Sequence, residues 1–439
     1  MLNLIIISHT LIWIAALFIY VRSSQASLFH PLSVFHLFYG IVFVLRPMEV
    51  HWLNFTTVLD VMRYALYDKD FINALLSADL TLIVFQTVMM RKISGWRPTD
   101  NRNMQISDTL RLSFRITFCI LLPMAVIMTL LSAGDTGGVR DTTTGQYIQT
   151  SSTGYLLDAP VIVLSLLIIN AIVGRMKLVA TLPLIALITY LLVFASRRWS
   201  LIITGETVFL AYAYYISQKR AVYFMIFISV FAVFPVFYIK GRDREIFQRI
   251  IRHQMTATEA ISSVLQQNTT LKDTFDGMDF AQYDTATLFI SLTPEVTKHY
   301  TWFLQWTQLF TEPIPRIWWP SKPVGPPIKT SDVNVLDYAN VMGFSMTMIG
   351  YGWVDLGYIG IIINSAVSAW IIGAIYCWFC RYSGNVVVTA AYFMLDAASI
   401  QYYRDGDISI FKFSLYLGLP FVVWYGIYRF QGGELRVRR

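Results

Sequence analysis

The sequence has few charged residues for its length. Of its 439 residues, 14% are Asp, Glu, Lys or Arg and 56% are hydrophobic. Soluble domains carry about 25% charged residues, so the composition argues against a soluble globular protein. The formal net charge is +7, but the basic residues lie between hydrophobic runs and form no extended tail. We therefore expect no nucleic-acid partner.

Cysteine is also scarce, and the familiar cofactor motifs are missing. Cys119, Cys377 and Cys380 all fall inside hydrophobic runs. The "CWFC" of the last two has redox spacing, which inside an apolar run is typical of ordinary packing. The chain has no phosphate-binding P-loop, no HExxH pair, no paired Cys/His zinc spacing and no GxSxG elbow. The sequence predicts no metal and no cofactor.

Long hydrophobic runs dominate what is present. Runs of about 20 residues recur along the chain, which is the length that a helix needs to cross a bilayer. A membrane β-barrel would instead show short alternating segments. The pattern predicts an all-α, polytopic helical membrane protein with about eleven transmembrane helices. We place these spans near residues 3–21, 28–45, 71–90, 112–132, 155–173, 178–195, 201–217, 221–239, 349–379, 385–402 and 409–428.

The short connections alternate in charge, which predicts an orientation. Basic residues follow each odd-numbered span, such as Arg22 after the first and Arg381 after the ninth. Connections rich in Lys and Arg stay in the cytoplasm. The amino terminus is then outside and the carboxyl terminus cytoplasmic. The chain divides into residues 1–239 with eight spans, residues 240–343 forming one large outer loop, and residues 344–439 with three spans and a tail.

The large outer loop contains two segments with helical spacing. In 243–265 ("DREIFQRIIRHQMTATEAISSVL") apolar residues recur on one face opposite basic residues. The run 294–311 ("TPEVTKHYTWFLQWTQLF") is rich in aromatic rings, which favour the headgroup level of a membrane. We expect both to form short amphipathic helices that lie on the membrane surface or against the bundle.

Positive side chains gather on the predicted outer side. The hairpin 196–199 ("SRRW") places two arginines in a short outer connection, against the charge rule, so a function other than topology is indicated for them. Guanidinium groups match phosphate oxygens and stay charged at any relevant pH. Ion pairing with nearby carboxylates is the alternative role. The candidate anion-binding cations are Arg197, Arg198, Arg242, Arg244, Arg316, Lys322 and Arg404.

Residues 313–323 ("PIPRIWWPSKP") combine four prolines, two tryptophans and two cations. Proline at this density excludes a helix and predicts a stiff loop. Such a loop would present Arg316 and Lys322 to phosphate while Trp319 meets a sugar or lipid. An aromatic anchor at the membrane interface is the competing interpretation.

Candidates for a general base lie in the same part of the chain. Asp279 belongs to "FDGMD", Asp355 to "GYGWVDLGYIG", and His299 lies in the outer loop. A carboxylate or imidazole can take a proton from a hydroxyl if its site orients it. Helix capping and ion pairing are the alternative roles for the carboxylates, and an ordinary exposed polar side chain is the alternative for His299.

These segments together resemble a known family. "EPIPRIWWPSKP" in a long outer loop, "FDGMD" before it and "GYGWVDLGYIG" after it are similar to the bacterial O-antigen polymerases, the Wzy-type oligosaccharide repeat-unit polymerases. The early "FHPLSVFHLFYGIVFVLRP", the "SRRW" hairpin and "YYRDGDISIFK" fit the same pattern. The resemblance covers nearly the whole chain in layout and is specific at the proline loop.

The resemblance implies a glycosyltransferase in the bacterial inner membrane. It would join repeat units carried on undecaprenyl diphosphate at the periplasmic face, with a chain-length regulator as a further partner. Asp279, His299 and Arg316 would then be catalytic, and the remaining cations with Trp319 and Asp355 would bind substrate. A diphosphate leaves readily once its charge is stabilised, so arginines can replace a metal and an acid catalyst.

Two other functions compete with a polymerase. A ligase that transfers glycan from the same lipid donor to lipid A-core would need the same groups. A flippase for lipid-linked glycan would make no bond and should place ionisable groups along a passage. In the sequence, Arg63, Asp79, Glu206 and Asp396 lie in or near spans without forming a run across the membrane, which favours an enzyme.

Overall fold

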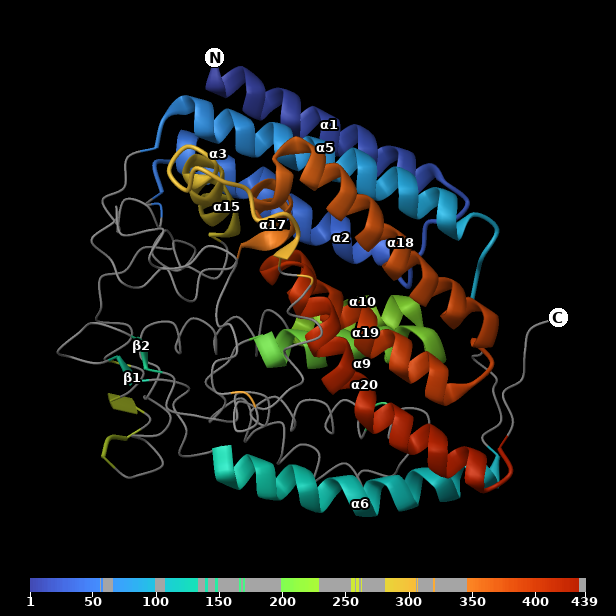
Figure 1. The fold of residues 1–439 in the computed structure, drawn as a ribbon. Helices are drawn as coiled ribbons and strands as arrows, with labels where there is room; N and C mark the ends of the chain where they lie inside the picture. Colours follow the sequence, from blue (N-terminus) through green and yellow to red (C-terminus); the bar gives the residue numbers. More distant parts are fainter. Residues whose placement is uncertain are drawn as a thin grey trace.

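The structure is a computed structural model of the whole chain. It describes residues 1–55, 57, 66–98, 107–132, 139–140, 147–148, 166, 169, 199–228, 254–256, 258–259, 262, 281–304, 306, 319 and 346–433. In these residues the regular structure is helical, as the sequence predicted (Figure 1). The exception is one antiparallel pair of two-residue strands.

The elements follow in chain order. They are α1 (Leu2–Arg22), α2 (Pro31–Tyr39), the π-helix η1 (Gly40–Leu45), α3 (Arg46–Trp52), α5 (Asp68–Ile93), α6 (Asp108–Ser132), β1 (Val139–Arg140), β2 (Tyr147–Ile148), α9 (Trp199–Tyr215), α10 (Gln218–Ile228), α15 (Gln282–Leu292), α17 (Thr347–Leu356), α18 (Tyr358–Tyr382), α19 (Val386–Asp405) and α20 (Asp407–Phe430).

Four helical stretches in the described residues are long and apolar enough to cross a membrane. These are Leu2–Arg22, Pro31–Trp52, Asp68–Ile93 and Tyr358–Tyr382. Helix α1 exposes large apolar side chains along its length, including Leu4 at 70%, Leu11 at 60% and Val21 at 60%. Such a surface is unfavourable in water and suited to lipid. The protein therefore has the helices of a membrane protein.

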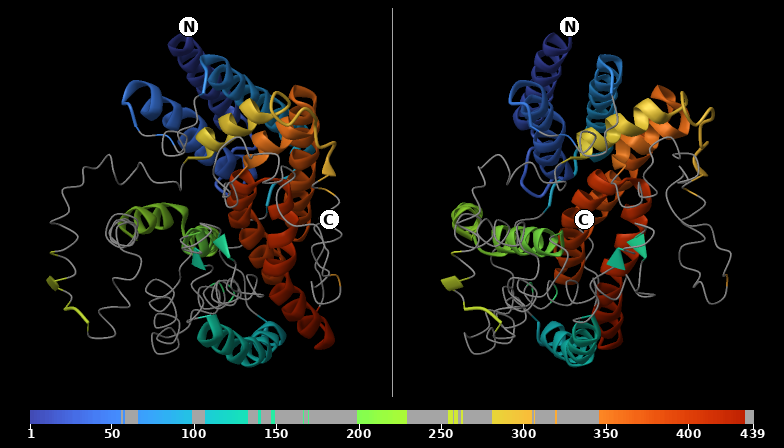
Figure 2. Two further views of the ribbon diagram at one scale, coloured as in Figure 1. Left: turned by 60° about the vertical axis from the view of Figure 1, so that its left-hand side comes forward. Right: turned by 90° about the vertical axis from the view of Figure 1, so that its left-hand side faces the viewer.

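Helices α1, α5 and α18 form one layer, with α2 behind it (Figure 1). Helix α5 packs against both α1 and α18, and α19 packs against α2, α9 and α20. In both views of Figure 2, α6 lies at the opposite end of the molecule from α1, where it contacts α20. The bundle thus brings the first and last parts of the chain together.

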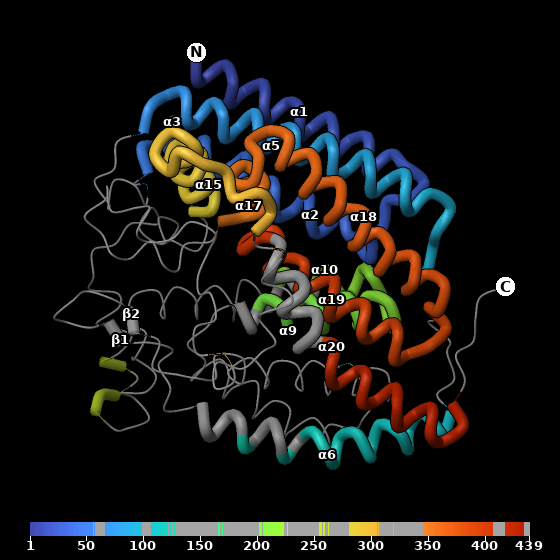
Figure 3. The backbone as a smooth tube through the Cα atoms, viewed as in Figure 1, coloured from blue at the N-terminus to red at the C-terminus, as the bar shows by residue number. Residues whose placement is uncertain are grey.

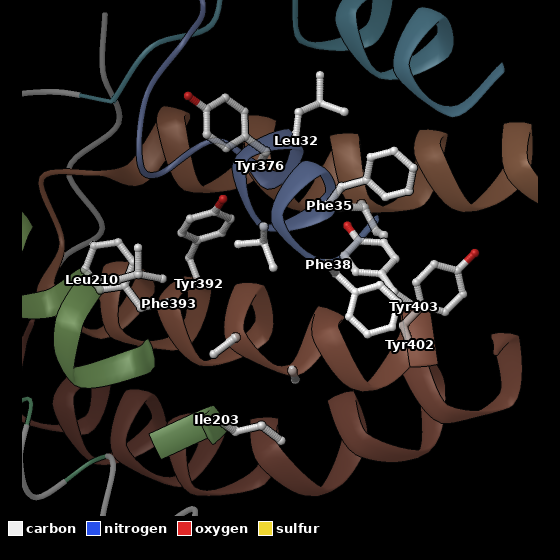
Figure 4. Close-up of a cluster of buried hydrophobic side chains, with 14 of the residues drawn as sticks. Leu32, Phe35, Phe38, Ile203, Leu210, Tyr376, Tyr392, Phe393, Tyr402 and Tyr403 are labelled. Carbon is white, nitrogen blue, oxygen red and sulfur yellow. The ribbon is translucent and has the colours of Figure 1, made fainter. Parts of the chain in front are cut away.

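The interior between α2, α9, α18 and α19 is filled largely by aromatic rings (Figure 4). The rings of Phe379 and Tyr392 stack at 4.1 Å, and those of Phe35 and Phe85 at 4.3 Å. The Tyr392 hydroxyl donates to the Phe29 carbonyl at 2.6 Å. Offset rings add attraction beyond their buried area, and the tyrosine needs a buried acceptor. These contacts hold α2 against α5, α18 against α19, and α19 against the residue Phe29 just before α2.

The second predicted span is longer than expected. The helix does not stop at residue 45 but continues through Arg46 and Pro47 to Trp52, with a π-helical turn over Gly40–Leu45. A Cβ on Gly40 would lie 2.7 Å from the Trp13 ring, so glycine lets α1 approach this turn. The Arg-Pro pair expected in a connection is therefore inside a helix.

The predicted span at 349–379 is wrong in one respect, because it is two helices. Helix α17 ends at Leu356 and α18 begins at Tyr358, and Gly357 between them has φ +61°. A Cβ on Gly352 would lie 2.8 Å from Ile361 Cα, and one on Gly360 would overlap the Gly352 carbonyl oxygen. Glycine at these positions lets α17 fold back onto α18. The hydrophobic run alone does not reveal this reversal.

Most other predicted spans coincide with helices, but their number stays a prediction. Helices α6, α9, α19 and α20 cover the predictions at 112–132, 201–217, 385–402 and 409–428, and α10 covers the start of the one at 221–239. The predicted spans at 155–173 and 178–195 lie almost wholly outside the described residues.

In the predicted large loop, the helix expected at 243–265 also lies mostly outside the described part. The one predicted to begin at residue 294 is wrong there, since 293–303 is made of turns and irregular backbone. A helix that the sequence did not indicate, α15, precedes this segment, and every one of its residues is buried.

Candidate functional site

Helix α15 is held to the spans by a buried ion pair. The Arg46 guanidinium donates to Asp284 through Nη2 at 2.8 Å and through Nε at 3.4 Å. Both side chains are 1% exposed, and Glu49 lies 3.7 Å from Arg46 Nη1. Two N–H groups facing one carboxylate give directional pairing in a dry setting. The pair fixes α15 on α3, at the carboxyl-terminal end of the helical stretch Pro31–Trp52.

Pro47 explains how the backbone near Arg46 is arranged. Proline has no N–H, so Pro47 cannot donate to the Phe43 carbonyl four residues earlier. His9 Nε2 of α1 lies 2.6 Å from that carbonyl oxygen, and His9 Nδ1 lies 2.8 Å from Asp79 of α5. The histidine, 1% exposed, thus links α1, α5 and the π-helical turn that leads into Arg46.

The segment after α15 is clamped to the α17–α18 turn by Asp355. This carboxylate is fully buried, and its Oδ1 accepts from Thr301 Oγ1 at 2.6 Å and from the Phe303 N–H at 2.9 Å. The Thr301 N–H donates to the Val354 carbonyl at 3.0 Å, and Trp353 Nε1 donates to the Thr293 carbonyl at 2.7 Å. In Figure 3 the yellow tube leaves α15 and passes beside α17. Asp355 is therefore positioned as an anchor of this segment.

His299 lies exposed on the same segment with a defined orientation. Its Nδ1 is 2.6 Å from the Thr297 carbonyl oxygen, while the Thr297 hydroxyl donates to the His299 carbonyl at 2.9 Å. A carbonyl only accepts, so Nδ1 carries the proton in the neutral ring and Nε2 has the lone pair. In this tautomer Nε2 is the ring nitrogen that can accept a proton.

Polar contacts surround the segment. Lys69 at the start of α5 donates to both oxygens of Glu295 at 2.8 and 2.9 Å, with both side chains more than half exposed. Inside, burial and the adjacent Asp284 carboxylate raise the pKa of Tyr283, so its hydroxyl stays protonated. This region of the chain thus combines an exposed ion pair, Lys69 with Glu295, and a buried one, Arg46 with Asp284.

Arg404 lies at the end of α19, where that helix meets α20. Its Nε is 3.7 Å from Asp405 Oδ1, and its side chain is 18% exposed. Gln401 donates to the other oxygen of Asp405. Gly406 has φ +90°, and a Cβ there would overlap the ring of Tyr351 in α17. The predicted anion-binding arginine thus has a carboxylate neighbour and lies at a junction that contacts α17.

The structure describes four of the residues predicted from sequence. His299, Asp355 and Arg404 are placed as above, and Trp319 is half-buried. Asp355, for which a substrate contact was predicted, is completely buried and accepts from Thr301 and Phe303, and the substrate contact stays a prediction. The other predicted site residues lie outside the described part of the chain: Asp279, Arg316, Arg197, Arg198, Arg242, Arg244 and Lys322.

Sequence reasoning missed Arg46, Asp284, His9 and the role of Asp79. An arginine directly before proline at the end of an apolar run was the available signal for Arg46, and the lone histidine of the first span was the signal for His9. Nothing local distinguishes Asp284. Within the described residues, no three His, Cys, Asp or Glu side chains come close enough to hold a metal.

No protein-family model, curated protein or solved structure matches this chain.

Proposed function

We propose that the protein is a glycosyltransferase that polymerises undecaprenyl-diphosphate-linked oligosaccharide repeat units into a surface polysaccharide, at the periplasmic face of the bacterial inner membrane. The observation that carries the proposal is the orientation of His299. Its Nδ1 is engaged by the Thr297 carbonyl at 2.6 Å, which leaves Nε2 as the lone-pair nitrogen on an exposed segment. A single base suffices for a reaction in which a hydroxyl attacks a sugar with a good leaving group.

The reaction assigned to this site is a displacement at an anomeric carbon. The terminal hydroxyl of one lipid-linked unit attacks the anomeric carbon of the chain carried on a second lipid. The new C–O bond forms as the bond to the diphosphate breaks, and its electron pair leaves with undecaprenyl diphosphate. The hydroxyl proton passes to Nε2 of His299 and then to water. Asp279 is the alternative base that the sequence indicates.

Positive groups must stabilise the departing diphosphate. Arg316 and Lys322 of the proline loop, Arg197 and Arg198 of the short hairpin, and Arg404 are the cations we assign to this task. Preorganised donors at developing negative charge contribute about a hundredfold or more in rate each. If Arg316 grips phosphate through a bidentate fork, Arg316→Lys should be nearly as inactive as Arg316→Ala, because an ammonium lacks the planar pair of donors.

The test is to incubate the purified protein with lipid-linked repeat units and separate the products on a gel. A ladder of lengths supports a polymerase, and single transfer to added lipid A-core supports a ligase. His299→Ala should abolish the ladder, whereas His253→Ala, which alters the other histidine of the large loop, should keep it. A full ladder from the His299 variant at matched protein level would remove this residue as the base.

A flippase is the second candidate, and buried ionisable groups favour it. His9 and Asp79 form a pair inside the bundle, and both carboxylate oxygens of Asp396 are buried without a hydrogen-bond partner in the described part. Intramembrane ionisable groups often mark a transport path. Movement of lipid-linked glycan across proteoliposomes without any new glycosidic bond would support this function instead.

A further inference from the structure

Trp302 is displayed in an unusual way. Its side chain is 71% exposed, although the indole is among the largest apolar groups in the chain. Its backbone has φ +52°, and the next residue, Phe303, has φ +59°. Two successive non-glycine residues in the left-handed region are disfavoured, and such conformations persist only where surrounding contacts impose them. The structure therefore holds this tryptophan outward instead of burying it.

The contacts that impose the conformation come from Asp355 and its neighbour. Asp355 Oδ1 accepts from Thr301 Oγ1 and from the Phe303 N–H, at 2.6 and 2.9 Å, on either side of Trp302. The Thr301 N–H donates to the Val354 carbonyl at 3.0 Å. A fully buried carboxylate thus fixes the residues before and after Trp302. A ring held this way loses little freedom when a ligand stacks on it.

Several of the residues that precede Trp302 along the segment are polar and exposed. Lys298 and His299 are exposed, and Glu295 pairs with Lys69 a little further along the segment. The alternative role for Trp302 is to anchor the loop in the bilayer. An anchor of that kind needs no fixed backbone and gains from exposed apolar neighbours, of which Leu304, 51% exposed, is one. A pyranose offers a flat apolar face for the indole and hydroxyls for the charged groups, which matches the polar residues of the segment.

We infer that Trp302 is the stacking platform for the acceptor sugar, beside His299, and that Asp355 is the positioning residue that holds it. The inference rests on the proposed function and names a part of the site that the sequence did not indicate. A pyranose ring lies on the indole, its terminal hydroxyl reaches Nε2 of His299, and the donor lipid approaches from the other side of that hydroxyl.

The test measures binding and turnover separately. Binding uses the host cell's own repeat-unit oligosaccharide, released from its lipid carrier, and calorimetry with the full-length protein in detergent. Trp302→Ala should weaken binding about tenfold, as expected for losing one stacked ring, and Trp302→Phe should recover part of it. In the ladder assay, Trp302→Ala should raise KM for the acceptor about tenfold with kcat nearly unchanged.

Two controls keep the inference open to refutation. Trp370→Ala removes another exposed tryptophan, 55% exposed on α18, and should leave binding unchanged. Asp355→Ala should weaken binding while Trp302 is still present, because it removes the oxygen that accepts from Thr301 Oγ1 and from the Phe303 N–H. Equal binding by wild type and Trp302→Ala would overturn the inference. So would quenching by brominated lipid chains of the part of the tryptophan fluorescence that is lost in Trp302→Ala. Trp302-dependent binding without any ladder would instead refute the polymerase and keep the glycan site.

Discussion

The buried pair between Arg46 and Asp284 makes the sharpest stability prediction. The change is Asp284→Ala, which leaves a guanidinium that is 1% exposed facing an apolar methyl group. Removing one partner of a buried pair costs about 3–5 kcal/mol because the other charge stays desolvated. Glu49, at 3.7 Å, still offers partial compensation, so we expect the lower end, about 3 kcal/mol. That corresponds to roughly a hundredfold change in the unfolding equilibrium.

The assay uses a cysteine that the fold hides. Cys380 is fully buried, whereas Cys119 is exposed and Cys377 is half-buried. In a background with Cys119→Ser and Cys377→Ala, labelling of Cys380 by a thiol reagent follows unfolding as sodium dodecyl sulfate is added to mixed micelles. The shift of the midpoint between wild type and Asp284→Ala gives the difference in unfolding free energy.

An exposed ion pair from the same region is the matched control. Glu295→Ala removes the ion-pair partner of Lys69. The Glu295 side chain is 62% exposed and that of Lys69 is 53% exposed. A surface pair contributes about 0–1 kcal/mol. The double variant Arg46→Met with Asp284→Leu should recover most of the loss, because it leaves no buried charge. The reasoning fails if Asp284→Ala costs no more than Glu295→Ala, or if the double variant is the least stable of the set.

Two further substitutions test how the helices approach one another. His9→Ala should lower the free energy of unfolding by about 1–3 kcal/mol, because the Phe43 carbonyl loses the hydrogen bond from His9. His9→Gln should recover part of this loss, because its amide can donate to the same carbonyl. An equal loss from both variants in the same labelling assay would contradict the role of that hydrogen bond. Gly360→Ala should cost about 3 kcal/mol or more, because its methyl overlaps the Gly352 carbonyl oxygen. At Gly426 an added Cβ would have no atom within 4 Å, so Gly426→Ala should leave stability unchanged or raise it slightly. A similar result for both glycines would refute the close crossing of α17 and α18.

The sequence by itself determined the class of fold and many helix positions. Apolar runs of membrane-spanning length predicted α1, α5, α6, α19 and α20 to within a few residues. This works because a helix satisfies its own backbone hydrogen bonds, so a long apolar run needs no partner to specify helix. The orientation of His299 could not be foreseen, because it depends on the turn that brings its Nδ1 to the Thr297 carbonyl.

Tertiary structure alone decided which residues meet. Helix α1 is apolar on all sides, so no periodicity reveals which face is buried, and His9 gains its role only from contact with Phe43 and Asp79. Arg46 and Asp284 are separated by 238 positions, and no local pattern links groups that far apart. The reversal at Gly357 likewise depends on how closely two backbones approach. Local sequence specifies the helices, whereas the site exists only where packing brings their ends and the loop between them together.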